Sequence, residues 1–344
     1  MSQKYLKKEN LSKLIESFTG GGGVFIAPTL DGRQIFYKAV ASSEEITFDY
    51  IVPKNSHKDV LFPQTEVVAN YTLGKDSVDV EGVTIEPPET VLFGIRPCDA
   101  ASVASLRSVF TWDFIDTFYT KREEKTIFIG VACTAADDSC FCTTVDVKPD
   151  SPEGSDLLLK ETTEGDYLVD VVTKRGEEFA GRFKEIFTDL SEGGEGIEPK
   201  KIVDVAPLEG IKGDKIAAFL SDPEHYEKGD LWGEMARKCM GCGACTFGCP
   251  TCHCFDIMDE GSITGGERRK NWDACQFDFF TTHAGSGHNP RDTQYKRWRN
   301  RFMCKFNYYP NKFTSKGCVG CGRCIRVCPV RLDITEVMEE ISQL

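Results

Sequence analysis

The spacing of apolar residues changes several times along the first two thirds of the chain. Over residues 4–18 apolar side chains recur every three or four positions, at Leu11, Leu14, Ile15 and Phe18. This period predicts an amphipathic helix. Short apolar runs that are typical of strands follow at 24–28, 34–40, 46–52, 78–85, 90–95 and 126–131.

The run at 90–95 begins a strand, helix and strand sequence. Residues 100–110 have helical spacing, with Asp99 placed to cap them, and the run at 126–131 follows. This order predicts a parallel βαβ unit. Farther on, the pattern predicts a strand pair and then a helix, at 157–162, 167–172 and 175–190. The N-terminal region is therefore expected to be mixed α/β.

A run of four glycines at residues 20–23 raises the question of nucleotide binding. A phosphate-cradling loop follows a strand and opens a helix, whereas this run precedes the apolar segment at 24–28. We interpret it as a turn. The chain by itself is therefore expected to bind neither a flavin nor NAD(P).

The C-terminal third contains one cysteine pattern twice. Residues 239–250 and 318–329 both read C-x2-C-x2-C-x3-C-P, the spacing by which bacterial-type ferredoxins hold [4Fe–4S] clusters. In that arrangement the fourth cysteine of each run binds the cluster of the other run. The expected ligands are Cys239, Cys242, Cys245 and Cys328 for a first cluster, and Cys318, Cys321, Cys324 and Cys249 for a second.

Structural zinc is the alternative interpretation of a C-x2-C pair. A zinc site needs four ligands in all, whereas each run here supplies four cysteines before its proline, and the run occurs twice. The duplicated pattern therefore favours iron–sulfur clusters.

Length and loop composition suggest how the chain is divided. Its 344 residues suggest about two domains, and residues 221–230 resemble a linker. The predicted division is an α/β domain over residues 1–228 and a helical, ferredoxin-like dicluster domain over 229–344. An insertion at 250–317 separates the two cysteine runs.

The predicted α/β domain holds four further cysteines. Cys98 and Cys133 each follow one strand of the expected parallel pair, and Cys140 and Cys142 share the next loop. Sites in such sheets gather beyond the carboxyl ends of the strands. A third [4Fe–4S] cluster is therefore expected on these thiols, with buried core cysteines as the alternative.

Four more cysteines lie in the insertion. Cys252, Cys254 and Cys275 are candidates for a further thiol site, with His283 or His288 as added ligands. A group of reduced, buried thiols explains the same residues. The pattern does not decide between the two.

The insertion is also basic in an acidic chain. Residues 263–316 carry eleven Lys or Arg and four Asp or Glu, whereas the whole chain has a formal net charge of −13. Basic and aromatic residues together can bind nucleic acid, cover the clusters as a helical cap, or dock an acidic partner. We favour a cap with a docking role, with Arg297, Arg299 and Arg301 facing the partner; the overall acidity argues against nucleic acid.

Composition indicates the compartment. Sixteen cysteines in cluster-type spacing, rather than a disulfide framework, indicate a reducing cytoplasm. The first residues lack the apolar core of a signal peptide, and no run of eighteen apolar residues predicts a membrane span. A cytoplasmic protein without membrane insertion is expected.

Several segments together resemble the iron–sulfur (beta) subunit of cytoplasmic NAD(P)-linked sulfhydrogenases and the corresponding iron–sulfur subunit of anaerobic sulfite reductase. The segments are 93–99, 140–143, 249–256, 272–275, 284–291 and 318–324. The resemblance implies an electron relay without a substrate pocket. It also implies a flavoprotein partner similar to ferredoxin–NAD(P) reductases and a terminal catalytic subunit of the hydrogenase, sulfur-reducing or sulfite-reducing type. Cys304 departs from the family pattern and is assigned no role.

Two other functions fit the same residues. One is a stand-alone polyferredoxin, for which the large α/β domain would be superfluous. The other is a heterodisulfide-reductase-like subunit with its own disulfide or sulfur chemistry. We expect an electron-transfer subunit of an oxidoreductase complex in anaerobic metabolism, and the sequence leaves open whether the chain is itself an enzyme.

Overall fold

A large mixed sheet forms the centre of the N-terminal region. The computed structural model describes residues 2–192, 196–313, 315 and 317–344. Eight strands lie in the order β10-β1-β9-β8-β7-β6-β2-β3, and the four from β8 to β2 are parallel. In chain order they are β1 (Gln3–Leu6), β2 (Val24–Asp31), β3 (Gln34–Ala39), β6 (Thr90–Ile95), β7 (Thr126–Val131), β8 (Leu157–Glu161), β9 (Tyr167–Val171) and β10 (Thr188–Asp189).

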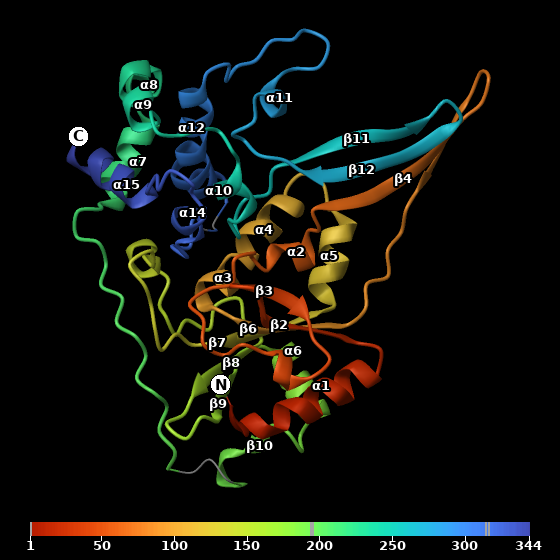
Figure 1. The fold of residues 1–344 in the computed structure, drawn as a ribbon, viewed down its shortest axis with the longest axis vertical. Helices are drawn as coiled ribbons and strands as arrows, with labels where there is room; N and C mark the ends of the chain where they lie inside the picture. Colours follow the sequence, from red (N-terminus) through yellow and green to blue (C-terminus); the bar gives the residue numbers. More distant parts are fainter. Residues whose placement is uncertain (1, 193–195, 314, 316) are drawn as a thin grey trace.

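Helices cover both faces of this sheet (Figure 1). Successive side chains of a strand point to opposite faces, so Phe93 of β6 packs with Phe18 and Phe179, whereas Leu92 packs with Leu106 on the other face. The helices of this region are α1 (Leu11–Gly20), α2 (Lys58–Leu61), α3 (Pro97–Ala101), α4 (Val103–Phe110), α5 (Thr117–Glu124) and α6 (Lys174–Arg182).

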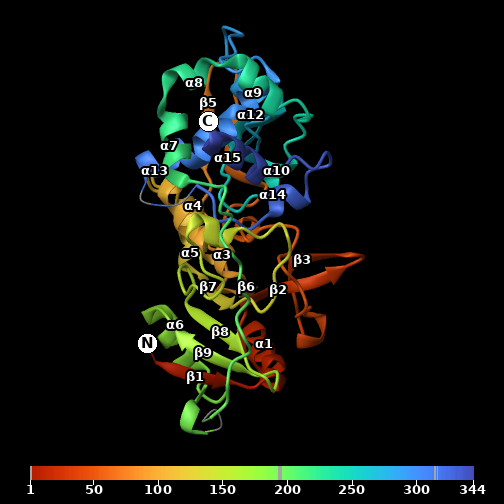
Figure 2. The same ribbon diagram turned by 90° about the vertical axis from the view of Figure 1, so that its left-hand side faces the viewer.

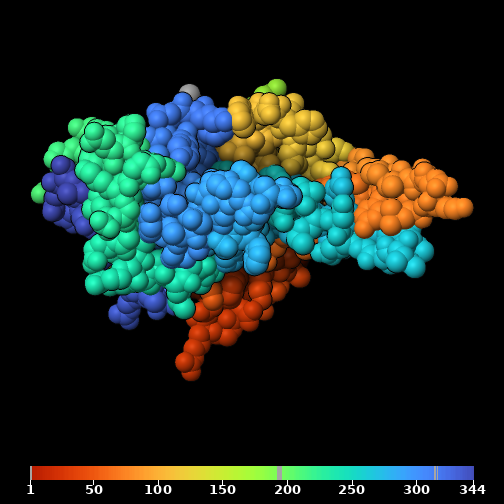
Figure 3. All heavy atoms as spheres, turned by 90° about the horizontal axis from the view of Figure 1, so that it is seen from above, coloured from red at the N-terminus to blue at the C-terminus, as the bar shows by residue number. Residues whose placement is uncertain are grey.

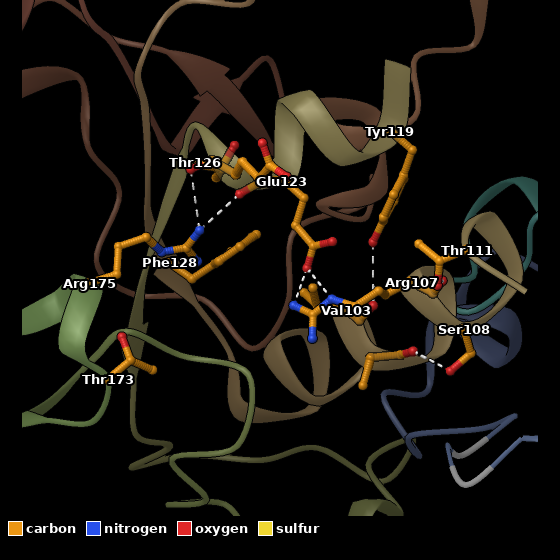
Figure 4. Close-up of polar contacts among 12 residues, drawn as sticks. Val103, Arg107, Ser108, Thr111, Tyr119, Glu123, Thr126, Phe128, Thr173 and Arg175 are labelled. Atoms are coloured by element: carbon orange, nitrogen blue, oxygen red, sulfur yellow. Dashed lines mark hydrogen bonds and ion pairs between the residues drawn. The ribbon is translucent and has the colours of Figure 1, made fainter. Parts of the chain in front are cut away.

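Polar contacts fix three of these helices relative to one another (Figure 4). Arg107 of α4 pairs with Glu123 of α5, and the Tyr119 hydroxyl donates to the Val103 carbonyl at 3.4 Å. Arg175 of α6 donates to the Glu123 carbonyl at 3.0 Å. These contacts join α4, α5 and α6 close to the amino end of β7, which begins at Thr126.

A second, four-stranded antiparallel sheet combines the two halves of the sequence. Its order is β11-β12-β4-β5, and it projects from the body as an arm (Figures 1 and 3). Its strands are β4 (Thr65–Leu73), β5 (Val78–Gly82), β11 (Phe255–Ser262) and β12 (Gly265–Trp272). Lys270 of β12 is buried between Glu66, at 2.8 Å, and Asp116, at 2.6 Å.

The C-terminal region is helical and has its own apolar core. Trp232, Trp298, Phe302 and Met338 are buried in it, and Figure 2 shows this bundle at the opposite end from the large sheet. Its helices are α7 (Gly213–Ser221), α8 (Pro223–Glu227), α9 (Gly229–Met235), α10 (Ala244–Phe247), α11 (Asp278–Thr281), α12 (Gln294–Met303), α13 (Tyr309–Lys312), α14 (Arg323–Arg326) and α15 (Ile334–Gln343), with a π-helical turn at Cys304–Tyr308.

The predicted fold class is confirmed, a mixed α/β region followed by a helical region with a long insertion. The predicted helix around Leu11–Phe18, the parallel pair β6 and β7, and the glycine turn before β2 are all present. The helix predicted at 175–190 ends at Arg182.

Three local predictions were wrong. Residues 221–230 form helices α8 and α9 rather than a linker. The insertion begins with the β11–β12 hairpin, so it is not wholly a helical cap. Strand β4 was missed because its half-exposed apolar residues alternate weakly.

Residues 46–52 also do not form the predicted strand. Only Ile46 makes a β-bridge. Arg96 explains why, since its guanidinium donates to the Ile51 carbonyl at 3.0 Å and to the Tyr50 carbonyl. These backbone groups are therefore satisfied by a side chain instead of a neighbouring strand.

Asp99 has a different role from the predicted helix cap. It lies inside α3, whose N-cap is Arg96. Both oxygens of the Asp99 carboxylate pair with the Arg323 guanidinium, with Nη2 to Oδ2 at 2.6 Å, and the Tyr37 hydroxyl donates to Oδ2 at 3.2 Å. Asp99 is 0% and Arg323 1% exposed. This buried ion pair ties the loop after β6 to the second cysteine run.

We expect Asp99→Asn to destabilise the chain by about 3–5 kcal/mol, because it leaves the Arg323 charge buried without its partner. The exposed pair between Asp259 and Arg268 gives the matched control, and Asp259→Asn should cost much less, because solvent screens an exposed ion pair. Urea unfolding of both variants measures the difference. Equal losses in the two variants would contradict the importance of the buried pair.

Candidate functional site: the cysteine groups

The first cysteine run surrounds a small cavity. Cys239, Cys242 and Cys245 line it together with two thiols of the second run, Cys324 and Cys328. Gly243 lies in the left-handed region with φ 72°, and a Cβ there would come within 2.8 Å of the Phe277 ring. A loop that bends this tightly favours glycine.

The second run is more deeply buried. The pKa of Cys324 is raised to about 12, mainly by burial and also by the neighbouring thiols of Cys318, Cys249 and Cys321, against the opposing effect of Arg301. Cys249, the last cysteine of the first run, therefore lies among the three thiols of the second. The short helices α10 and α14, which contact each other, lead to Cys249 and Cys328.

The four cysteines of the N-terminal region also line one cavity. Cys98, Cys133, Cys140 and Cys142 come from the loops after β6 and β7. The rest of the lining is mostly apolar, with Arg96 as the one charged side chain. Burial raises the pKa of Cys142 to about 11. Such thiols bind metal only as thiolates, so binding here would release protons.

This N-terminal group lies directly against the second run. Cys321 lines the same cavity, and the Phe141 amide donates to the Gly320 carbonyl at 3.0 Å. Gly320 has φ 63°, and a Cβ there would lie 2.4 Å from the Cα of Cys142. The two loops therefore make backbone contact, which leaves no room for a side chain between the thiol groups.

The remaining thiols meet in one place. Cys254 and Cys275 are within hydrogen-bonding reach of each other, and Cys252 and Cys304 are close enough to raise the pKa of Cys254. The hydrogen bond from Cys254 is the main cause that lowers the pKa of Cys275 to about 6. Cys304 was assigned no role in the sequence analysis, because this cysteine belongs to no spacing motif.

The two histidines predicted as added ligands lie elsewhere. His283 and His288 pack ring against ring, 5.4 Å between centroids, in an exposed loop. The His283 amide also donates to the His288 carbonyl at 2.8 Å, so the loop closes on itself. The two rings are therefore placed against each other rather than against the thiols.

Buried cations surround the cysteines of the C-terminal region. Lys305 Nζ lies 3.2 Å from the Cys249 sulfur and 2.9 Å from the Thr251 hydroxyl. Burial alone lowers the pKa of Lys305, but the Cys249 and Cys252 thiols raise it well above its usual value. Lys58 donates to the Thr246 and Cys252 carbonyls, both at 3.1 Å. Lys58 and Lys305 were missed in the sequence analysis, because lysine side chains are usually exposed to solvent.

The prediction that Arg297, Arg299 and Arg301 face a partner is wrong for Arg299 and Arg301, because both are buried. Arg299 is 3% and Arg301 4% exposed. Arg301 donates to the Cys245 carbonyl at 3.3 Å, and Arg297 pairs with Asp278 at 2.6 Å. Arg301 and Lys305 are thus turned inward, toward the thiols, whereas Arg299 packs against Tyr226.

The thiols of these groups are not arranged around the position of a single metal ion. Among the described residues, no three His, Cys, Asp or Glu side chains are placed to hold one metal ion. The donor sets consist of thiols alone, which suit iron–sulfur clusters. No described helix is both long and apolar enough to cross a membrane.

Comparisons with known proteins agree with this chemistry. Residues 238–332 match the family model of the 4Fe-4S dicluster domain. The chain is 31% identical over 316 residues to Sulfhydrogenase 2 subunit beta of Pyrococcus furiosus, with 89% of each chain covered. No solved structure matches. The assignment of each thiol to a particular cluster stays a prediction.

Crossed ligation can be tested by two substitutions. Cys249→Ser should impair the cluster built on the second run, whereas Cys328→Ser should impair the one built on the first. Electron paramagnetic resonance of each reduced variant distinguishes the two. Loss of the cluster of the substituted run itself, in both variants, would contradict the arrangement.

The contact between the loops can be tested at Gly320. We expect Gly320→Ala to lower the iron content of the N-terminal group, because the new Cβ would clash with the Cys142 backbone. Gly287 is the matched control, with φ 66° and no heavy atom within 4 Å of a Cβ. Gly287→Ala should cost only the backbone strain of about 1–2 kcal/mol. Iron analysis with unchanged content in both variants would contradict the contact.

Proposed function

This chain belongs to the sulfhydrogenase beta-subunit family, and from that premise we propose that it relays electrons between a flavin- and NAD(P)-binding partner subunit and a terminal redox subunit. The family and the dicluster domain make it an iron–sulfur electron-transfer subunit of a multisubunit oxidoreductase. The terminal subunit is of the hydrogenase, sulfur-reducing or sulfite-reducing type.

The observation that carries the proposal is the contact between the cysteine groups. The N-terminal group meets the second run at Gly320 and Cys142. Cys328 lies beside the thiols of the first run and Cys249 beside those of the second. Clusters on these thiols would form a continuous series through a mostly apolar interior. Such surroundings and local charge set cluster potentials.

Both ends of the series approach the surface. Cys242 is exposed, and the neighbouring Met240 is 64% exposed. At the other end, residues 134–138 form a largely exposed loop between Cys133 and Cys140. Each partner could therefore exchange electrons with one end, while hydride and substrate chemistry take place in the partners. We place this complex in the cytoplasm, and the chain itself needs to bind no NAD(P).

The proposal is tested with the complex purified anaerobically. NAD(P)H should reduce the iron–sulfur clusters of the complex, but not those of the isolated chain, because the chain depends on the flavin partner. In a Cys98→Ser complex, transfer from NAD(P)H to the terminal acceptor should fall to the background rate. Dithionite should still reduce the C-terminal clusters, which controls for misfolding.

Stopped-flow absorbance and turnover assays give both readouts. Full turnover in the Cys98→Ser complex would exclude the N-terminal group from the relay. Reduction of the isolated chain by NAD(P)H would contradict the need for a flavin partner. Substrate turnover by the isolated chain with a dye donor would make it an enzyme in its own right.

A further inference from the structure

Three separate segments of the insertion meet beside the second cysteine run. The Asp273 amide donates to the Cys254 carbonyl at 3.0 Å. The Tyr309 hydroxyl and His253 Nδ1 lie 2.8 Å apart, and Lys305 reaches Thr251. These bonds hold residues 251–254, 273–276 and 304–309 together.

The segments bring four thiols to this meeting point. Cys254 and Cys275 are within hydrogen-bonding reach of each other, and Cys252 and Cys304 act electrostatically on Cys254. Cys275 also lies 3.8 Å from the Thr246 hydroxyl. None of the four belongs to a duplicated run or to the N-terminal group, although Cys252 is within hydrogen-bonding reach of Cys249.

The turn that carries Cys304 is unusual. Cys304–Tyr308 is π-helical and directly follows α12. A π turn widens the helix and redirects its side chains, and such turns are frequent at functional sites. Here it directs Lys305 inward, with only 4% of that residue exposed.

Positive charge at this point lacks a carboxylate partner. Within the described part of the chain, no Asp or Glu pairs with Arg301 or Lys305. Arg301 Nη2 is buried and has no hydrogen-bond partner. Buried charges are strongly unfavourable unless they are paired. Cys252 acts on both cations, so an anionic group bound to it would supply part of the missing charge.

We propose that Cys252, Cys254, Cys275 and Cys304 bind a further [4Fe–4S] cluster, beside the series already described. A set of four thiols suits iron–sulfur or zinc. Arg301 and Lys305 would then balance its charge together with that of the neighbouring cluster at Cys249.

Iron and sulfide analysis of the full chain, reconstituted anaerobically, tests the proposal. Cys275→Ala and Cys304→Ala should each lose about four iron atoms relative to the unsubstituted chain, one [4Fe–4S] cluster. The double variant should lose the same four and no more, because both thiols hold one cluster. Met303→Leu, a buried neighbour of Cys304, is the control and should lose none.

Several results would overturn the proposal. They are unchanged iron in Cys304→Ala, additive losses in the double variant, stoichiometric zinc at these thiols, or a Cys254–Cys275 disulfide formed on oxidation without loss of iron. Reduction by NAD(P)H in the complex is a separate readout. An unsubstituted chain that holds no iron at these thiols yet is still reduced there would refute the further cluster and leave the relay intact.

Discussion

The buried ion pair between Asp99 and Arg323 is the contact on which the arrangement of the cysteine groups depends. Asp99 directly follows Cys98, and Arg323 lies between Cys321 and Cys324. A buried ion pair is stable only when both partners are present and well placed. One interaction therefore fixes the N-terminal thiols and the second run relative to each other, and the backbone contact at Gly320 follows from it.

Charge balance is the second constraint on this interior. The chain is acidic overall, yet Arg301 and Lys305 are buried among thiols. Iron–sulfur clusters with thiolate ligands are anionic, and buried cations beside them offset the desolvation of both. The same cations are a means of adjusting cluster potentials, which respond to local charge and exposure. These two cations of the insertion therefore act inside the molecule rather than on its surface.

The two sheets have different parts in this arrangement. The parallel strands β6 and β7 end side by side, which brings Cys98 and Cys133 to one edge. The arm of β4, β5, β11 and β12 joins the insertion to the N-terminal region. Because that sheet takes strands from both sides of the predicted boundary, the division at residue 228 stays a prediction.

The sequence by itself determined what depends on local spacing. Four thiols within one short run belong to the same loop, so the duplicated pattern predicted two groups of thiols. The order of β6, α4 and β7 indicated that the N-terminal cysteines share one edge of the sheet. Only the tertiary structure placed Cys304 beside Cys254 and turned Arg299 and Arg301 inward. A helix with this many charged residues is typically exposed, and its sequence does not show what lies against it. The positive charges that lie beside the thiols of the two runs come from segments distant in sequence. Only the packed fold could therefore decide which cations are buried.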